Sequence, residues 1–170
     1  ALALGTALLP SAPPAITVAR SARALQPGEL VVLTITTVEP AKALHVRAFD
    51  KAFLPFAVSN DARTWKVLVG IDLDVKPGTY AVSISTGSTT PAHATHTLVV
   101  RAKAFPTRRL TVDEAFVNPA PEALERIQRD AKDLEQVWTA SAAERLWTSG
   151  FVRPVPDESN SAFGTRSIFN

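Results

Sequence analysis

The feature that most constrains the fold of this 170-residue chain is a series of short alternating segments across residues 16–102. In residues 44–49, for example, Leu44, Val46 and Ala48 alternate with His45 and Arg47. Because successive side chains of a strand point to opposite faces, each such segment predicts a strand with one buried face. Several short strands separated by turn residues predict an antiparallel β-sandwich. The most regular of these segments are residues 30–36, 44–49, 65–71, 80–85 and 96–101.

One turn in this series indicates a type of sandwich. Pro77-Gly78 precedes Tyr80, whose strand places Tyr80, Val82 and Ile84 on one face. This segment resembles the E–F corner of immunoglobulin-like domains, in which a Pro-Gly turn precedes a tyrosine that begins the next strand. The resemblance implies an immunoglobulin-like β-sandwich over residues 15–104. Such sandwiches host many functions, so the fold alone assigns none.

The pattern changes to a helical period after residue 105. Pro119 and Pro121 mark a helix start, since proline is tolerated in the first turn. A capping box from Ser141 to Glu144 predicts a second, shorter helix. We therefore expect a connector over residues 105–150, with helices near 120–139 and 142–149. The apolar stripe of the first helix has spacings of three and four and consists of Leu124, Ile127, Ala131, Leu134 and Trp138.

The first residues of the chain indicate export. Residues 1–9 are an apolar run followed by Pro10-Ser11-Ala12, which is typical of the end of a signal peptide and its cleavage zone. We expect residues 1–14 to be a disordered signal-peptide remnant, and the protein to be periplasmic, envelope-bound or extracellular. A frayed apolar terminus is the alternative. The run is too short to cross a bilayer as a helix, so no membrane span is expected.

Charge and composition exclude several classes of function. The net charge is only +2, and no basic face with interleaved aromatic residues is visible, so a nucleic-acid partner is not expected. The densest basic stretch, residues 101–109, is interpreted as a solvated strand edge. The chain has no cysteine, which excludes disulfides, thiolate nucleophiles and cysteine metal ligands together.

No set of residues in this sequence is sufficient for catalysis or metal binding. His93 and His96 have a His-x-x-His spacing, but they lie at the beginning of a strand, where residues three apart point to opposite faces. Asp72 and Asp74 are interpreted as a solvated strand end, because a calcium site would need more oxygen ligands. There is no Gly-x-Ser-x-Gly motif for a serine nucleophile. We therefore predict no catalytic residue, no metal ligand and no cofactor.

Three tryptophans are candidates for stacking on sugars. Trp138 and Trp147 fit the faces of the predicted helices, where packing is the more common role. Trp65 begins a strand and is the one retained as a candidate binding residue.

The last third of the chain carries an ordered set of motifs that ends in Phe163-Gly164-x-Arg166. This order is similar to the segment that enters the catalytic domain of lysostaphin/LytM-type murein endopeptidases. In that family a Phe-Gly-x-Arg stretch begins the catalytic β-fold, and His-x-x-x-Asp and His-x-His motifs follow. Two histidines and one aspartate hold a zinc ion, which activates a water to cleave cross-links in peptidoglycan. The preceding motifs are Arg109-Leu110-Thr111-Val112 and Phe116-Val117-Asn118-Pro119.

The resemblance implies that residues 151–170 are the truncated start of a peptidase domain. Neither zinc-binding motif follows Phe163, so only Phe163, Gly164 and Arg166 carry over, as structural residues. Zinc is then expected only in the missing C-terminal domain, and this chain should be inactive alone. The implied function is the accessory N-terminal region of an exported zinc endopeptidase, with peptidoglycan or the catalytic domain as partner. The alternative is a stand-alone exported immunoglobulin-like module that binds glycan or protein or acts as a spacer. The oligomeric state stays open.

Overall fold

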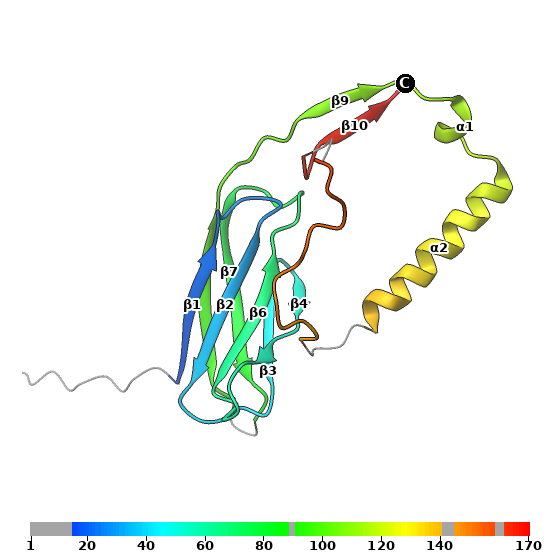
Figure 1. Ribbon diagram of the computed structural model, residues 1–170. Helices are drawn as coiled ribbons and strands as arrows, with labels where there is room; N and C mark the ends of the chain where they lie inside the picture. Colours follow the sequence, from blue (N-terminus) through cyan, green and yellow to red (C-terminus); the bar gives the residue numbers. More distant parts are fainter. Residues whose placement is uncertain (1–14, 89–90, 141–144, 159–161) are drawn as a thin grey trace, which may run out of the picture.

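The structure is a computed structural model that describes residues 15–88, 91–140, 145–158 and 162–170. Two four-stranded antiparallel sheets form its main body (Figure 1). The mainly β, antiparallel character predicted from the sequence is therefore confirmed. The first sheet has the order β1 (Ile16–Ala22), β2 (Leu30–Thr37), β6 (Thr64–Gly70), β5 (Phe56–Ala57). The second has the order β4 (Lys51–Phe53), β3 (Leu44–Ala48), β7 (Gly78–Thr86), β8 (His93–Val100).

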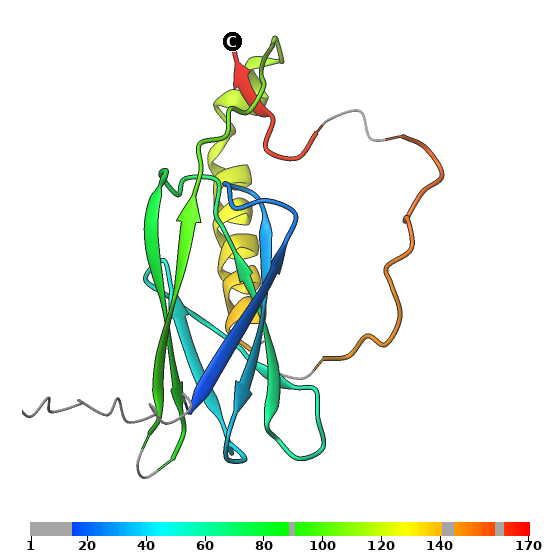
Figure 2. The same ribbon diagram turned by 90° about the vertical axis from the view of Figure 1, so that its left-hand side faces the viewer.

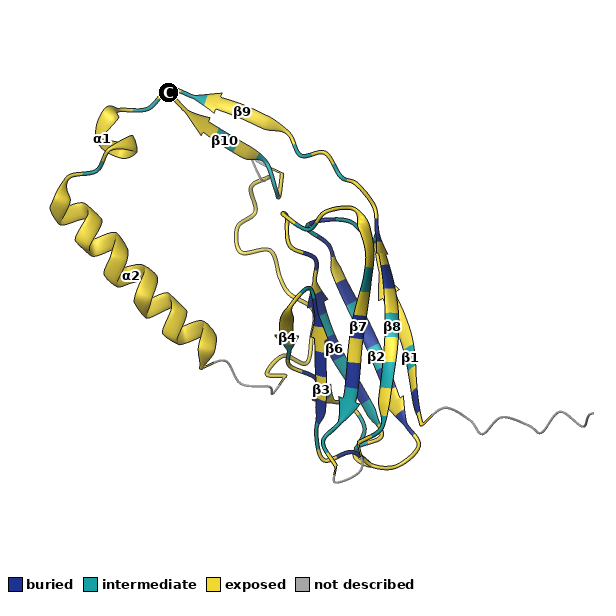
Figure 3. Ribbon diagram, turned by 180° about the vertical axis from the view of Figure 1, so that it is seen from behind, coloured by how far each residue is buried: buried dark blue, intermediate teal, exposed yellow. Residues whose placement is uncertain are grey.

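The two sheets face each other as layers and enclose one hydrophobic core (Figures 2 and 3). The alternating positions of each strand supply it, because every second side chain points inward. On paired strands the inward residues face each other, as Leu33 on β2 does with Val67 on β6. A slip of one residue would turn these side chains to solvent, so burial specifies the register. The largest fully buried side chains are Leu33, Ile35, Ile71, Ile84, Leu98, Val31, Val46, Val67, Val69 and Val82.

Strands β1 and β8 are edge strands of different sheets, yet they lie side by side where the two layers meet (Figure 3). The chain turns back from β1 to β2 at one end of this seam, and it leaves the sandwich after β8 at the same end. A backbone hydrogen bond from Arg101 to the Leu25 carbonyl, 2.8 Å long, joins the two segments. The exit of the chain is thus held against the β1–β2 loop.

Beyond the sandwich the chain makes a long excursion and returns (Figure 1). It runs through β9 (Thr107–Leu110), α1 (Glu114–Val117) and α2 (Pro121–Thr139), and it comes back as β10 (Arg166–Phe169). β10 pairs with β9 in parallel, as a separate two-stranded sheet. No residue of α2 is buried.

The long helix expected near residues 120–139 is α2, whereas the second predicted helix is absent from its described part. Residues 145–149 are not helical, and residues 141–144 lie outside the described residues. A helix of about eight residues is marginal in water, because its few hydrogen bonds do not offset the unfavourable free energy of helix nucleation. The exposed side chains of this segment supply little packing that would offset that cost.

The predicted signal-peptide remnant, residues 1–14, also lies outside the described residues. Among the helices that the structure describes, none is both long enough and apolar enough to cross a membrane.

Candidate functional site

The histidines do not form a metal centre. His45 and His93 are exposed, while His96 lies on the inward-facing side of β8 and is partly buried. Within the described ranges, no three histidine, aspartate or glutamate side chains come together to hold a metal ion. The residues present therefore do not fit the zinc of the endopeptidase family, and no chemical step is assigned to zinc in this chain.

Trp65 is not a sugar-stacking residue, and the prediction that it is a candidate binding residue is wrong. Its side chain points inward from β6, at the same face as Val67 and Val69, and only 9% of it is exposed. The indole nitrogen donates a hydrogen bond to the Ala62 carbonyl, 3.0 Å away. The alternation that makes β6 a strand also turns Trp65 into the core, so no ligand can stack on it.

Of the other two tryptophans, Trp138 does not pack as expected, whereas Trp147 does pack, although not within a helix. Trp138 was expected to pack within a helix face, but 73% of it is exposed on α2. Trp147 lies in an extended segment, with its ring 6.3 Å from Phe56 of β5 and 6.1 Å from Phe151. Arg145 lies over the Trp147 ring at 5.5 Å from its centroid. These contacts bring the returning segment to the β5 edge of the sandwich.

Gly164 occupies a position that other residues would strain. Its φ of +85° is in the left-handed region, which favours glycine. A β-carbon at this position would also overlap the ring of Phe105, which lies against the glycine backbone. Both the backbone conformation and the contact with Phe105 therefore require glycine at position 164.

Phe163 and Arg166 fasten the same segment on either side of Gly164. Phe163, which is 73% exposed, places its ring against Gly28 of the β1–β2 loop, where a β-carbon would be 3.0 Å from it. The Arg166 amide donates to the Pro106 carbonyl at 2.9 Å, and this bond begins the pairing of β10 with β9. The three motif residues therefore join the returning chain to the end of the sandwich.

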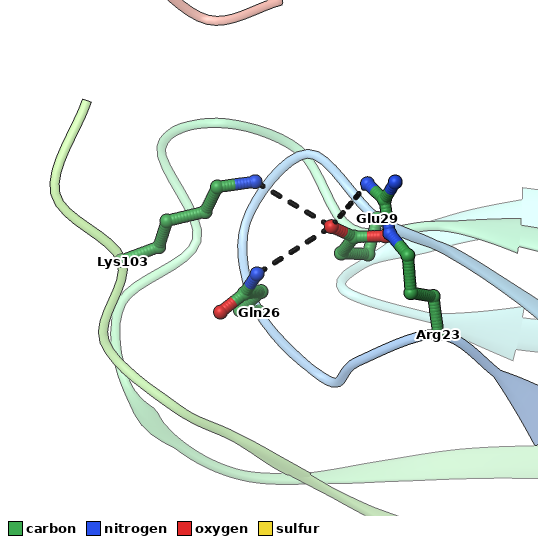
Figure 4. Close-up of polar contacts among 4 residues, drawn as sticks. All are labelled: Arg23, Gln26, Glu29 and Lys103. Atoms are coloured by element: carbon green, nitrogen blue, oxygen red, sulfur yellow. Dashed lines mark hydrogen bonds and ion pairs between the residues drawn. The ribbon is translucent and has the colours of Figure 1, made fainter. Parts of the chain in front are cut away.

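A buried carboxylate, Glu29, lies at the end of the β1–β2 loop among three polar side chains (Figure 4). Glu29 is only 7% exposed and accepts two hydrogen bonds from Arg23, at 2.8 and 3.1 Å. Gln26 donates to it at 3.4 Å and Lys103 at 3.5 Å. The hydrogen bond from Arg23 is the main reason why the pKa of Glu29 falls from 4.5 to about 2, against the opposing effect of burial.

The Glu29 cluster continues to the motif residues. The Lys103 ammonium that contacts Glu29 also lies 5.0 Å from the centroid of the Phe105 ring. Phe105 is the ring against which Gly164 packs. A continuous set of contacts therefore runs from the β1–β2 loop to the beginning of β10. Sequence reasoning missed Glu29, Lys103 and Phe105, because the partners of Glu29 lie as far as 74 residues away.

The excursion exposes a large apolar surface, which we call the arm surface. It consists of one face of α2 together with two exposed apolar residues of β10, and Figure 3 shows both elements as largely exposed. Apolar faces of this extent on a helix and a sheet are typical of sites that bind another protein surface. Its members are Leu124, Ile127, Leu134, Trp138, Ile168 and Phe169, which are between 42% and 73% exposed.

Comparison with known proteins finds likeness only among solved structures. No family model matches the chain, and no curated protein matches it. A solved structure from Pseudomonas aeruginosa, described as a peptidase M23, superposes with a TM-score of 0.39 and 21% identity. The superposition covers 65% of this chain and 38% of that chain. A likeness at this level assigns neither a family nor a function to this chain.

Proposed function

We propose that this chain is the accessory, non-catalytic region of an exported peptidoglycan zinc metalloendopeptidase, and that it positions or restrains the catalytic domain. The catalytic domain would dock on the arm surface. The observation that carries this proposal is the arrangement of Phe163, Gly164 and Arg166. The motif that begins the catalytic fold in lysostaphin/LytM-type enzymes is anchored here to the exit of the sandwich.

The pairing of β9 with β10 supports the same proposal. Parallel sheets occur almost only where both faces are covered, whereas this pair has two strands and exposed apolar residues. A further β-domain that begins with β10 would cover it. Helix α2 supports the same proposal, because none of its residues is buried within the described structure.

We further propose that the sandwich is immunoglobulin-like. Its strand order is β1-β2-β6-β5 in one sheet and β4-β3-β7-β8 in the other, which corresponds to the ABED and CFG sheets of immunoglobulin domains with β4 as an additional edge strand beside β3. The Tyr80 hydroxyl donates to the Lys76 carbonyl at 2.7 Å, as the tyrosine does in a tyrosine corner.

The first test is to read the source DNA past the codon for Asn170. We expect a His-x-x-x-Asp motif and then a His-x-His motif in frame. A stop codon directly after Asn170 would overturn the accessory-region proposal and favour the stand-alone module. That alternative no longer has Trp65 as its binding residue, because Trp65 is in the core.

The second test measures docking of the catalytic domain in trans. An Ile127→Asp/Leu134→Asp variant should bind the separately expressed domain at least about tenfold more weakly, because two exposed apolar side chains of the arm surface are lost. Leu54→Asp is the matched control, since Leu54 is equally exposed but lies on the sandwich. Equal affinity of all three proteins would show that α2 is not the docking surface.

A further inference from the structure

A basic groove lies at the seam where β1 and β8 end, on the sandwich rather than on the arm surface. It has a volume of about 490 Å³. Arg20 and Arg23 come from the β1 side, and Arg101 comes from the β8 side. Leu25 and Val99 provide apolar surface between them, and Gln26 adds an amide. Two neighbouring arginines and a third from about eighty residues further along the chain therefore line one concave surface.

The charges in this groove are not balanced. Its lining contains no acidic residue. Arg23 is paired with Glu29, but that carboxylate is buried behind the loop and is also shared with Lys103. Over the described part of the chain, no ion pair involves Arg20 or Arg101. Two exposed arginines thus face the groove with a positive potential that Glu29 offsets only in part.

His96 lies at the same seam as Arg20. Its ring lies between the layers on β8, and its Nε2 has no hydrogen-bond partner. Burial is the first cause that lowers its pKa, and the positive charge of Arg20 is the second. The field of Arg20 therefore acts at the seam, and an anion bound beside Arg20 would weaken it.

Exposed basic residues on an edge strand ordinarily protect that strand from pairing with another chain. Two features go beyond that role here. The arginines gather in a concavity instead of standing along a flat edge, and they flank apolar surface formed by Leu25 and Val99. Guanidinium groups recognise carboxylates and phosphates through paired, charge-assisted hydrogen bonds.

We infer that this groove binds an oxyanion, a phosphate or carboxylate group, of a cell-envelope polymer through Arg20 and Arg101. The choice of an envelope polymer rests on the proposed export of the protein. The groove itself is independent of the docking proposal, because the arm surface contributes no residue to it.

The experiment is co-sedimentation of the full chain with insoluble cell-wall sacculi at low ionic strength. Arg20→Glu/Arg101→Glu should bind at least about tenfold more weakly than the unaltered chain, because two charge-assisted contacts become repulsive. Arg47→Glu/Arg63→Glu is the matched control, since it changes the net charge equally at exposed arginines elsewhere on the sandwich. This control should bind within about twofold of the unaltered chain, and binding should weaken as salt rises.

Sacculi stripped of phosphodiester-linked polymers identify the source of the oxyanion. Loss of binding on stripping indicates phosphate, and retained binding indicates the carboxylates of the peptide stems. Either result supports the groove, provided that the Arg20/Arg101 variant is selectively impaired. Equal loss in both double variants, or no binding by the unaltered chain, overturns the inference.

A second readout does not depend on sacculi. Titration with inorganic phosphate should raise the pKa of His96, followed by NMR, because the anion offsets the charge of Arg20. The shift should disappear in Arg20→Gln, a variant that removes the charge at an exposed position and so preserves the fold. An identical shift in both proteins would contradict binding at this groove.

Discussion

Among individual residues, Glu29 shows how one buried charge can organise a junction. A carboxylate that is 7% exposed persists because Arg23, Gln26 and Lys103 all donate to it. Removing one partner of such a group costs more than the net value of the interaction, since the remaining charge stays buried.

Glu29→Gln should change how stability depends on pH. The folded-state pKa of about 2 lies below the ordinary value of 4.5, so ionised Glu29 stabilises the fold above pH 4.5. That contribution is lost as the pH falls from 4.5 towards 2. Thermal unfolding midpoints of the two proteins should therefore differ at pH 7 and converge near pH 2. Glu39→Gln, at an exposed carboxylate, is the control, and a constant difference across this range would contradict the assignment.

Gly164→Ala should release β10 from β9 without unfolding the sandwich. The positive φ and the Phe105 ring both oppose a β-carbon, at a local cost of about 1–3 kcal/mol. Hydrogen exchange should accelerate at the Arg166 and Asn170 amides, which bond to Pro106 and Leu110. Gly150→Ala is a matched control, because no atom lies near its β-carbon position. Unchanged exchange in Gly164→Ala would contradict this account.

At the level of elements, the strands of the sandwich and helix α2 are stabilised by different interactions. The strands of the sandwich are held by a shared core, whereas α2 has an apolar stripe but no buried residue. Its support is local, with an ion pair from Arg126 to Asp130 and proline at its first position. The sandwich and the helix should therefore respond differently to loss of an apolar side chain.

Leu33→Ala should destabilise the sandwich by about 2–5 kcal/mol, because it leaves a cavity in the core. Leu134→Ala should change the same unfolding transition by less than about 0.5 kcal/mol, because Leu134 is exposed on α2. Urea unfolding followed by tryptophan fluorescence measures both, since unfolding exposes the buried Trp65. A comparable loss in the two variants would show that α2 packs on the sandwich.

Over the whole molecule, the hydrophobic core belongs to one part of the chain. Every residue of the core cluster lies between Ile16 and Val100, and Lys103 completes the Glu29 cluster. The excursion from β9 to β10 meets this body through the Phe163 junction and the contact of Trp147 with Phe56. The core that stabilises the protein and the proposed docking surface thus lie in separate parts of the chain.

A protein that consists of residues 15–104 should fold alone. Its thermal midpoint should lie within a few degrees of that of the full chain, because it retains the entire core. Differential scanning calorimetry of the two proteins checks this. A large fall in the midpoint would mean that the excursion stabilises the sandwich.

The sequence alone determined the parts of this protein that depend on neighbouring residues. Period-two alternation located β2, β3, β6, β7 and β8 to within a few residues, and a period of 3.6 located α2. Two predictions from the sequence were wrong, at places where local patterns are ambiguous. The capping box at Ser141 did not produce a helix over residues 145–149, and Trp65 at the beginning of β6 proved to be buried.

Only the tertiary structure decided which distant residues meet. It joined Glu29 to Lys103, seated Gly164 against Phe105, and paired β10 with β9 across the whole excursion. It also brought Arg101 to a groove with Arg20 and Arg23. The physical reason is that periodicity reports which face of an element is buried, whereas partners depend on how the sheets pack.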